Sequence, residues 1–224
     1  VVLTILFAFL HVQSASALDR YITITSSGTI KVKPDTVRIN VTAWATANSS
    51  ALALDQAKST SSKVRTLLSN LSIKSEYLKS SSLNVFPEYN YTPDKGLVLL
   101  DYKASQTFEI IVRAANNAGQ IVDALVEAGG NNLSIDGVTP FLYDSSVASE
   151  SARITAVKAA KVKVNSYAKL LGTRIGKITY LEESTSPNTY PVMMAQAKSD
   201  MGATVIDLGT QDLTVTITTR WALL

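Results

Sequence analysis

The sequence predicts an α+β fold: a mixed or antiparallel sheet with helices packed on one face. Segments in which apolar and polar residues alternate outnumber the segments that repeat apolar residues with helical spacing. The two kinds follow the order ββαββαβαββ, so helices fall between strands without alternating strictly with them. No stretch composed like a linker interrupts residues 18–224, which we expect to form a single domain.

The first two strands are predicted from period-two patterns on either side of a turn. Residues 21–25 (YITIT) alternate, and residues 26–28 (SSG) are expected to bend the chain before alternation resumes at Ile30. Pro34 and Asp35 form a turn dipeptide. The next strand is expected to be buried on the face that carries Val37, Ile39, Val41 and Ala43.

A helix and a long hairpin are predicted next. Residues 48–50 (NSS) offer N-capping side chains to a helix whose apolar residues continue to Leu71. Strands at 81–89 and 97–113 flank a Pro-Asp-Lys-Gly turn at 93–96. The pattern therefore predicts a long hairpin with aromatic residues near its tip.

The second half of the chain is expected to add two helices and three strands. A short helix runs from residue 116 to two glycines at 129–130, and a strand follows at 133–143. The longest helix is expected over 146–171, before strands at 175–183 and 213–221. The inward residues of the longest helix are expected to be Ile154, Val157, Ala160, Val164, Ala168 and Leu171.

Residues 1–17 are interpreted as a secretory signal peptide. Residues 1–10 carry no charge, and Ala15, Ser16 and Ala17 form a small-x-small cleavage signal. Ten to twelve apolar residues are too few to span a bilayer as a helix, and no longer apolar stretch follows. We expect an exported protein (periplasmic, cell-surface or secreted) with no transmembrane helix in the mature chain. Retention of the leader as an anchor is the alternative.

Composition removes most catalytic chemistry. The chain has 224 residues and a net charge of +3, with no cysteine and one histidine, His11, inside the predicted signal peptide. The mature chain therefore has no thiolate nucleophile, disulfide, zinc finger, Ser-His-Asp triad or histidine-ligated metal. Glu182 and Glu183 form the single acidic doublet, and neighbours in a strand point to opposite faces. We expect no enzymatic activity, catalytic residue, cofactor or metal site.

A basic segment without acidic residues covers 153–177, largely within the longest helix. Its helical cations are Arg153, Lys158, Lys161, Lys163 and Lys169. Such a face attracts anionic lipid headgroups, polysaccharide or nucleic acid, and export argues against nucleic acid as a partner. This predicts, as the alternative function, a binding module for an anionic envelope ligand. The other interpretation is a solvated helix face whose last cations favour the helix C-terminus through its dipole.

Aromatic residues predict a protein-contact surface. Phe86, Tyr89 and Tyr91 lie near the hairpin tip, and Tyr190 lies in a later loop. Exposed aromatic rings bury much area at low cost in entropy, and the outer strands of a sheet need a partner or protection. We therefore expect a homo-oligomer. Packing of these rings over the domain's own sheet edge is the alternative.

Four motifs, in order and across nearly all of residues 18–224, resemble the SIMPL-domain family. Residues 28–35 (GTIKVKPD) resemble its entry strand, G-x-apolar-x-apolar-x-P-D. Residues 101–105 (DYKAS) resemble its G-Y-x-A-(S/N) strand start, and 156–172 resemble its A-V-x-x-A…A-x-x-L-G long helix. Gly209 resembles the glycine that usually precedes the closing strand.

The sequence departs from that family pattern in two places. Ser26 and Ser27 stand where the family often has another glycine, and Asp101 replaces the glycine before the tyrosine. The family includes bacterial periplasmic oxidative-stress defence proteins and a periplasmic immunogenic protein. The resemblance implies an exported, self-associating α+β protein without a known enzymatic activity, linked to oxidative-stress or envelope-stress tolerance.

Overall fold

The computed structural model describes residues 20–184 and 204–224. By their internal contacts these residues form two compact units. Unit 1 comprises 20–28, 152–184 and 215–224, and unit 2 comprises 29–151 and 204–214. The signal-peptide prediction for residues 1–17 and the predicted contact residue Tyr190 lie outside the described residues. The assignment of 18–224 to a single domain stays a prediction.

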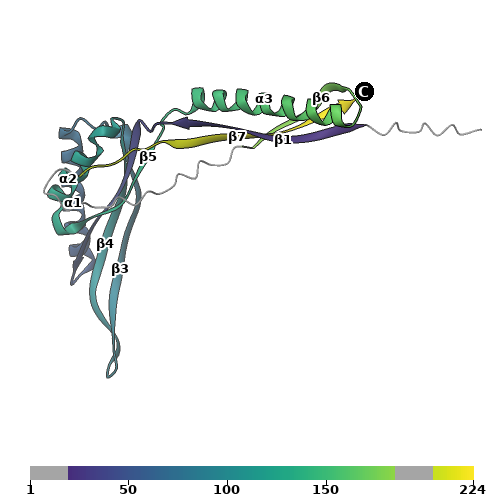
Figure 1. Cartoon of the computed structure of the whole chain (residues 1–224). Helices are drawn as coiled ribbons and strands as arrows, with labels where there is room; N and C mark the ends of the chain where they lie inside the picture. Colours follow the sequence, from purple (N-terminus) through teal and green to yellow (C-terminus); the bar gives the residue numbers. More distant parts are fainter. Residues whose placement is uncertain (1–19, 185–203) are drawn as a thin grey trace, which may run out of the picture. The chain divides into compact units, whose positions relative to one another are not determined.

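The elements follow the predicted order ββαββαβαββ, and the α+β class is confirmed (Figure 1). The strands form two antiparallel sheets, with the orders β3-β4-β2-β5 and β1-β7-β6. The strands are β1 (Tyr21–Val32), β2 (Thr36–Ala47), β3 (Leu78–Thr92), β4 (Gly96–Val112), β5 (Leu133–Phe141), β6 (Ile175–Ser184) and β7 (Gln211–Leu223). The helices are α1 (Ser50–Asn70), α2 (Ala118–Gly129) and α3 (Ser146–Leu170).

Unit 2 is built on the face of β2 that the sequence predicts to be buried. Val37, Ile39, Val41 and Ala43 are fully buried there, because the period-two pattern turns every second side chain of β2 to the same side. The same core contains side chains of both helices and of β4: Val64, Leu68, Phe108, Ile110, Val112, Ile121 and Leu125. Both α1 and α2 therefore cover one face of this sheet, as predicted.

In unit 1, α3 is buried along one narrow row of small residues. The buried side chains recur at every fourth position: Ala152, Ala156, Ala160, Val164 and Ala168. The prediction that Ile154 and Leu171 point inward is wrong, since both lie off this row and are exposed. Small side chains let a helix approach a sheet closely.

The predicted bend at residues 26–28 is wrong, because β1 runs without interruption from Tyr21 to Val32. Gly28 is needed there for space. A Cβ atom at Gly28 would lie 2.1 Å from the Ala152 carbonyl oxygen and 2.5 Å from the Ala156 nitrogen. Next to it, the Ser26 hydroxyl donates a 2.9 Å hydrogen bond to the Ala156 carbonyl. The glycine therefore marks the close approach of α3 to β1 and not a turn.

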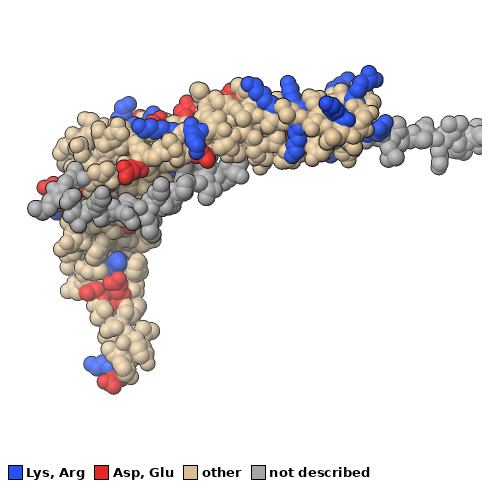
Figure 2. All heavy atoms as spheres, in the orientation of Figure 1, with Lys and Arg blue, Asp and Glu red and all other residues tan. Residues whose placement is uncertain are grey.

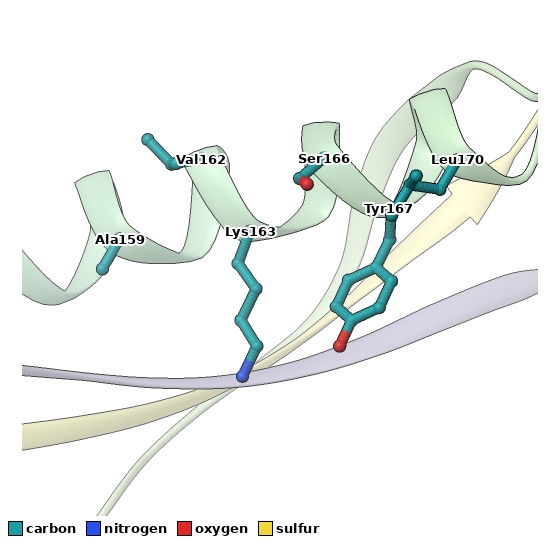
Figure 3. Close-up of a pocket in the computed structure, with 6 residues that line it drawn as sticks. All are labelled: Ala159, Val162, Lys163, Ser166, Tyr167 and Leu170. Carbon is teal, nitrogen blue, oxygen red and sulfur yellow. The ribbon is translucent and has the colours of Figure 1, made fainter.

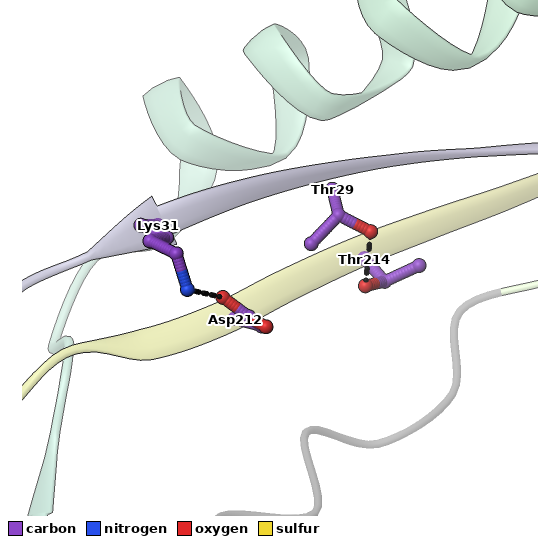
Figure 4. A network of polar contacts seen from close by, with 4 residues as sticks. All are labelled: Thr29, Lys31, Asp212 and Thr214. Atoms are coloured by element: carbon purple, nitrogen blue, oxygen red, sulfur yellow. Dashed lines mark hydrogen bonds and ion pairs between the residues drawn. The ribbon is translucent and has the colours of Figure 1, made fainter.

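Side-chain pairs join β1 and β7, strands from opposite ends of the sequence. Hydroxyl pairs link Thr25 with Thr218 (3.1 Å), Ser27 with Thr216 (2.8 Å) and Thr29 with Thr214 (2.8 Å). The Lys31 ammonium lies 3.0 Å from Asp212 in the next pair of the same series (Figure 4). Partner numbers fall as β1 advances, so the pairing is antiparallel. Such cross-strand pairs contribute roughly 0.2–1 kcal/mol each to sheet stability.

Candidate functional site

The first candidate surface is the outer half of the β3–β4 hairpin, which we call the arm (residues 83–102). The predicted hairpin is confirmed: β3 and β4 pair until Thr92 lies opposite Gly96, and the turn closes between them. In Figure 1 the two strands continue beyond the helices of unit 2. Almost all of β3 is exposed, whereas the inner half of β4 is buried or half-buried.

The arm has one apolar face, which continues the buried face of the sheet. The strand register places its residues on the same side as buried Ala104 and Phe108, because Val85 pairs with Ala104, and a bulge at Leu100 restores this side nearer the tip. We call this set the arm face: Leu83, Val85, Tyr89, Tyr91, Leu97 and Leu99. All six side chains are between 40% and 73% exposed.

Helix α1 stops covering this face at Tyr102. Tyr102 and Leu54 pack against a small alanine cluster that joins α1 to β2 and β4. The opposite face of the arm carries charged side chains as well as Phe86: Glu88 lies 3.8 Å from the Lys103 ammonium, which also lies 5.1 Å from the centre of the Trp44 ring. The arm is therefore an amphipathic ribbon whose apolar side is exposed.

The predicted contact residues of the hairpin fall on both sides of the arm. Tyr89 and Tyr91 belong to the arm face, whereas Phe86 pairs with Lys103 on the polar side. All three are exposed, and their role in contacts stays a prediction. Sequence reasoning missed the four aliphatic members of the arm face. Cross-strand pairing with the tyrosines identifies two of them: Tyr89 pairs with Leu99, and Tyr91 with Leu97.

The second candidate surface is the basic part of α3. Lys158, Lys161 and Lys169 are exposed, as the prediction of a cationic face requires. Arg153 is engaged instead, because its Nε lies 2.7 Å from a carboxylate oxygen of Glu183 on β6. Lys163 donates a 3.2 Å hydrogen bond to the Thr25 carbonyl of β1. The proposed patch is thus divided between side chains directed to solvent and side chains bound to the sheet.

Charge is unevenly divided between the two units. The described part of unit 1 has nine basic side chains and two acidic ones, a formal charge of +7, although the whole chain is only +3. The basic residues are Arg20, Arg153, Lys158, Lys161, Lys163, Lys169, Arg174, Lys177 and Arg220, and the acidic residues are Glu182 and Glu183. In Figure 2 basic side chains are spread along the surface that α3 forms. The rest of the chain is net negative.

An open hollow lies along the same helix. It has a volume of about 600 Å³ and lies between two exposed rows of α3, lined by Ala159, Val162, Lys163, Ser166, Tyr167 and Leu170 (Figure 3). In Figure 3 the Lys163 and Tyr167 side chains extend from α3 in the same direction, toward β1. The hollow therefore combines apolar walls with one ammonium and one phenol.

The two carboxylates of the acidic doublet have different partners. The Tyr180 hydroxyl donates to Glu182, while Glu183 binds Arg153, so the prediction that the two carboxylates diverge is confirmed. The hydrogen bond to Glu182 raises the pKa of Tyr180 above its ordinary value, with burial and the charge of Glu182 acting in the same direction.

Two aspartates have pKa values below the ordinary range for local reasons. Hydrogen bonds from the Thr204 hydroxyl and backbone N–H lower the pKa of Asp123. Those from the Ser146 side chain and backbone do the same for Asp144 at the start of α3. Within residues 20–184 and 204–224 no three metal-binding side chains come together. Across these same ranges, no helix has the length and apolar character needed to cross a membrane.

Comparison with known protein families identifies the family of this chain. The model of the SIMPL family, described as a protein of unknown function (DUF541), matches residues 22–221. This chain belongs to the SIMPL family. A SIMPL relative from Edwardsiella ictaluri (strain 93-146), named Uncharacterized protein YggE, is 25% identical over 181 residues, which cover 79% of this chain and 75% of the relative. The resemblance inferred from the sequence motifs is thus confirmed.

The SIMPL entry motif has a structural role in this chain. The Asp35 carboxylate accepts hydrogen bonds from the Tyr143 backbone N–H (2.9 Å) and the Thr36 hydroxyl (2.8 Å). The Asp35 backbone also pairs with Phe141 and Ala115. One aspartate therefore joins the start of β2 to the segments that follow β4 and β5, and its oxygens serve the fold.

Proposed function

We propose that this SIMPL protein is an exported, non-enzymatic protein that assembles with copies of itself through the arm and supports envelope or oxidative-stress tolerance. One observation carries the assembly: the arm face exposes six large apolar side chains on a hairpin that α1 leaves uncovered. A two-stranded ribbon is at best marginally stable in water without a covering layer. Large contiguous apolar patches mark interaction sites.

The energetics allow a second copy of this chain as the cover. Full burial of one large apolar side chain contributes about 1.5–3 kcal/mol, so covering six half-exposed ones recovers about 5–9 kcal/mol. This is comparable with the cost of association. The arm face has no charged residue, so two copies can stack face to face without like-charge repulsion. Glu88 and Lys103 lie on the other side.

The test is the mass of the purified protein in solution. At micromolar concentration, light scattering should give a multiple of the monomer mass for the natural protein, where the monomer with its leader is 24.0 kDa. The double variant Tyr91→Ser/Leu97→Ser removes one cross-strand pair of the arm face and should lower the mass to that of a monomer. Val147→Ser and Val205→Ser, at equally exposed positions of unit 2, are the matched controls. A monomeric natural protein, or an unchanged mass for the double variant, would contradict the proposal.

The other parts of the proposal have separate support. Export rests on the leader at residues 1–17, and stress tolerance rests on the family resemblance. The absence of thiols and of a mature-chain imidazole supports a non-enzymatic role, as do the structural contacts of Asp35 and Glu183. Complementation of a deletion strain under peroxide tests the stress role: the natural protein should restore growth and the arm variant should not.

A second candidate function is binding of an anionic envelope component through α3, and the charge segregation of unit 1 favours it. Lys158→Gln/Lys161→Gln/Lys169→Gln should elute from immobilised heparin at a distinctly lower salt concentration. The control Lys33→Gln/Lys63→Gln/Lys79→Gln removes the same charge from exposed sites of unit 2 and should elute with the natural protein. Equal shifts for both triple variants would show that heparin retention depends on net charge alone, and would reject a binding site on α3.

A further inference from the structure

The outermost row of α3 carries exposed aliphatic side chains where a solvated helix would be polar. Residues two positions beyond each buried one lie about 200° around the helix, which places Ile154, Lys158, Val162, Ser166 and Leu170 on the side opposite the sheet. Val162 is 72% exposed and Leu170 is 78% exposed. These side chains contribute nothing to the core of unit 1 and create an apolar strip in its most basic region.

Apolar and basic groups lie close together along this helix. Lys158 belongs to the outermost row itself, and Lys161 and Lys169 lie on the row beside it. On the other side is the hollow, where Tyr167 and Lys163 adjoin Val162 and Leu170 (Figure 3). Lys163 uses one of its three donors on the Thr25 carbonyl, which leaves two for a ligand.

We propose that this face of α3 docks on an anionic lipid surface, with Val162 and Leu170 entering the boundary between headgroups and acyl chains. The inference rests on the second candidate function and names its ligand. Helices that lie in a membrane interface combine exposed aliphatic side chains with lysines in this way. The lysines contact the phosphates of anionic headgroups.

The alternatives to lipid use only part of this surface. A soluble polyanion or polysaccharide is bound by the lysines and gains nothing from Val162 or Leu170. A second copy of this chain would meet the lysines with acidic side chains of its unit 2, and the oligomeric mass of the variants tests that outcome. An anionic bilayer matches both the charge of the surface and its apolar strip. Val162 and Leu170 are about 12 Å apart along the helix, so both can reach one plane when α3 lies flat.

The experiment measures flotation of the full chain with two kinds of vesicle: phosphatidylcholine alone, and phosphatidylcholine with phosphatidylglycerol in a roughly 7:3 ratio. The natural protein should float with the second kind only. Val162→Ser/Leu170→Ser should weaken binding about tenfold and leave heparin retention unchanged. The triple lysine variant at positions 158, 161 and 169 should weaken vesicle binding about a hundredfold, since each lysine near the surface contributes about a fivefold factor.

Each outcome separates the lipid proposal from the function on which it rests. Val147→Ser, on the first turn of α3, is the matched control and should bind like the natural protein.

If Val162→Ser/Leu170→Ser binds vesicles normally while heparin retention still depends on the lysines, the lipid proposal is overturned and anionic binding stands. If the lysine variant changes neither assay, both are overturned. A fall in oligomeric mass for the serine variant, with vesicle binding unchanged, would assign the strip to a second copy. Unchanged melting temperatures show that each variant is folded.

Discussion

Replacement of Gly28 by alanine tests the packing of α3 on β1. The added Cβ would lie 2.1 Å from the Ala152 carbonyl oxygen, 2.5 Å from the Ala156 nitrogen and 2.8 Å from the Thr155 Cβ. Two of these atoms belong to the helix backbone, so no side-chain rotation relieves the overlap. The helix has to move away from the strand by about 1 Å before the shortest distance becomes tolerable.

The loss of stability follows from the gap that this displacement opens between α3 and the sheet. Four buried alanines and Val164 hold α3 in unit 1, and together they contribute about 5 kcal/mol. A gap of 0.5–1 Å forfeits roughly a quarter to a half of the dispersion energy of the atoms beside it. Gly28→Ala is therefore expected to lower the free energy of unfolding of unit 1 by about 1–3 kcal/mol, the range usual for an overpacked core.

The two tryptophans allow unit 1 to be followed by itself, since Trp44 lies in unit 2 and Trp221 in unit 1. In a Trp44→Phe background, urea unfolding monitored by fluorescence reports on Trp221. Gly28→Ala should lower the midpoint of that transition. Gly137→Ala in β5 is the matched control, because nothing but the Asn40 amide, at 4.0 Å, lies near the new Cβ. Equal midpoints for the two alanine variants would refute the close approach of α3.

Two further predictions concern side-chain contacts. The lowered pKa of Asp123 means that its hydrogen bonds to Thr204 stabilise the folded state when the carboxylate is ionised. This contribution is complete at pH values above the ordinary pKa of 3.8 and is lost as the pH falls through the lower pKa of the folded state. The destabilisation by Asp123→Ala should therefore shrink on acidification. A pH-independent difference in urea midpoint would contradict this. A double-mutant cycle on Arg153 and Glu183 should give a coupling of about 0.5–1 kcal/mol, because the pair is partly exposed. The coupling should weaken in high salt, and a salt-independent value would contradict a solvent-screened ion pair.

Some features of the arm can be predicted from the sequence and others cannot. The hairpin, its turn and its exposed tyrosines follow from local patterns, because alternation and turn residues act over a few positions. The arm face does not follow. Leu97 and Leu99 are odd-numbered, whereas the buried residues of β4 are even-numbered, and the bulge at Leu100 brings both sets to the same side. Period-two reading of the sequence places them on opposite faces.

The basic segment shows a similar division. The run of cations at 153–177 is visible in the sequence, and the exposed position of Lys158, Lys161 and Lys169 agrees with it. Ion pairing with a distant strand is not visible in the sequence. The sequence therefore predicts an Arg153 available to a ligand, whereas the structure pairs it with Glu183, 30 positions later. The apolar outer row was also missed. Helical periodicity predicts Ile154 in the core, because an aliphatic side chain on a helix is expected to face the sheet, yet Ile154 is exposed.

The sequence by itself determined the order of the elements, the family and the lack of cysteine, because these depend on composition and on patterns over a few residues. Only the tertiary structure decided the role of Gly28, which depends on a helix that begins more than a hundred positions later. It also decided the charge of unit 1. A chain of net charge +3 contains a unit of +7 because segments 20–28, 152–184 and 215–224 fold together. Burial and charge density are properties of residues that are near in space, and distance along the chain does not reveal them.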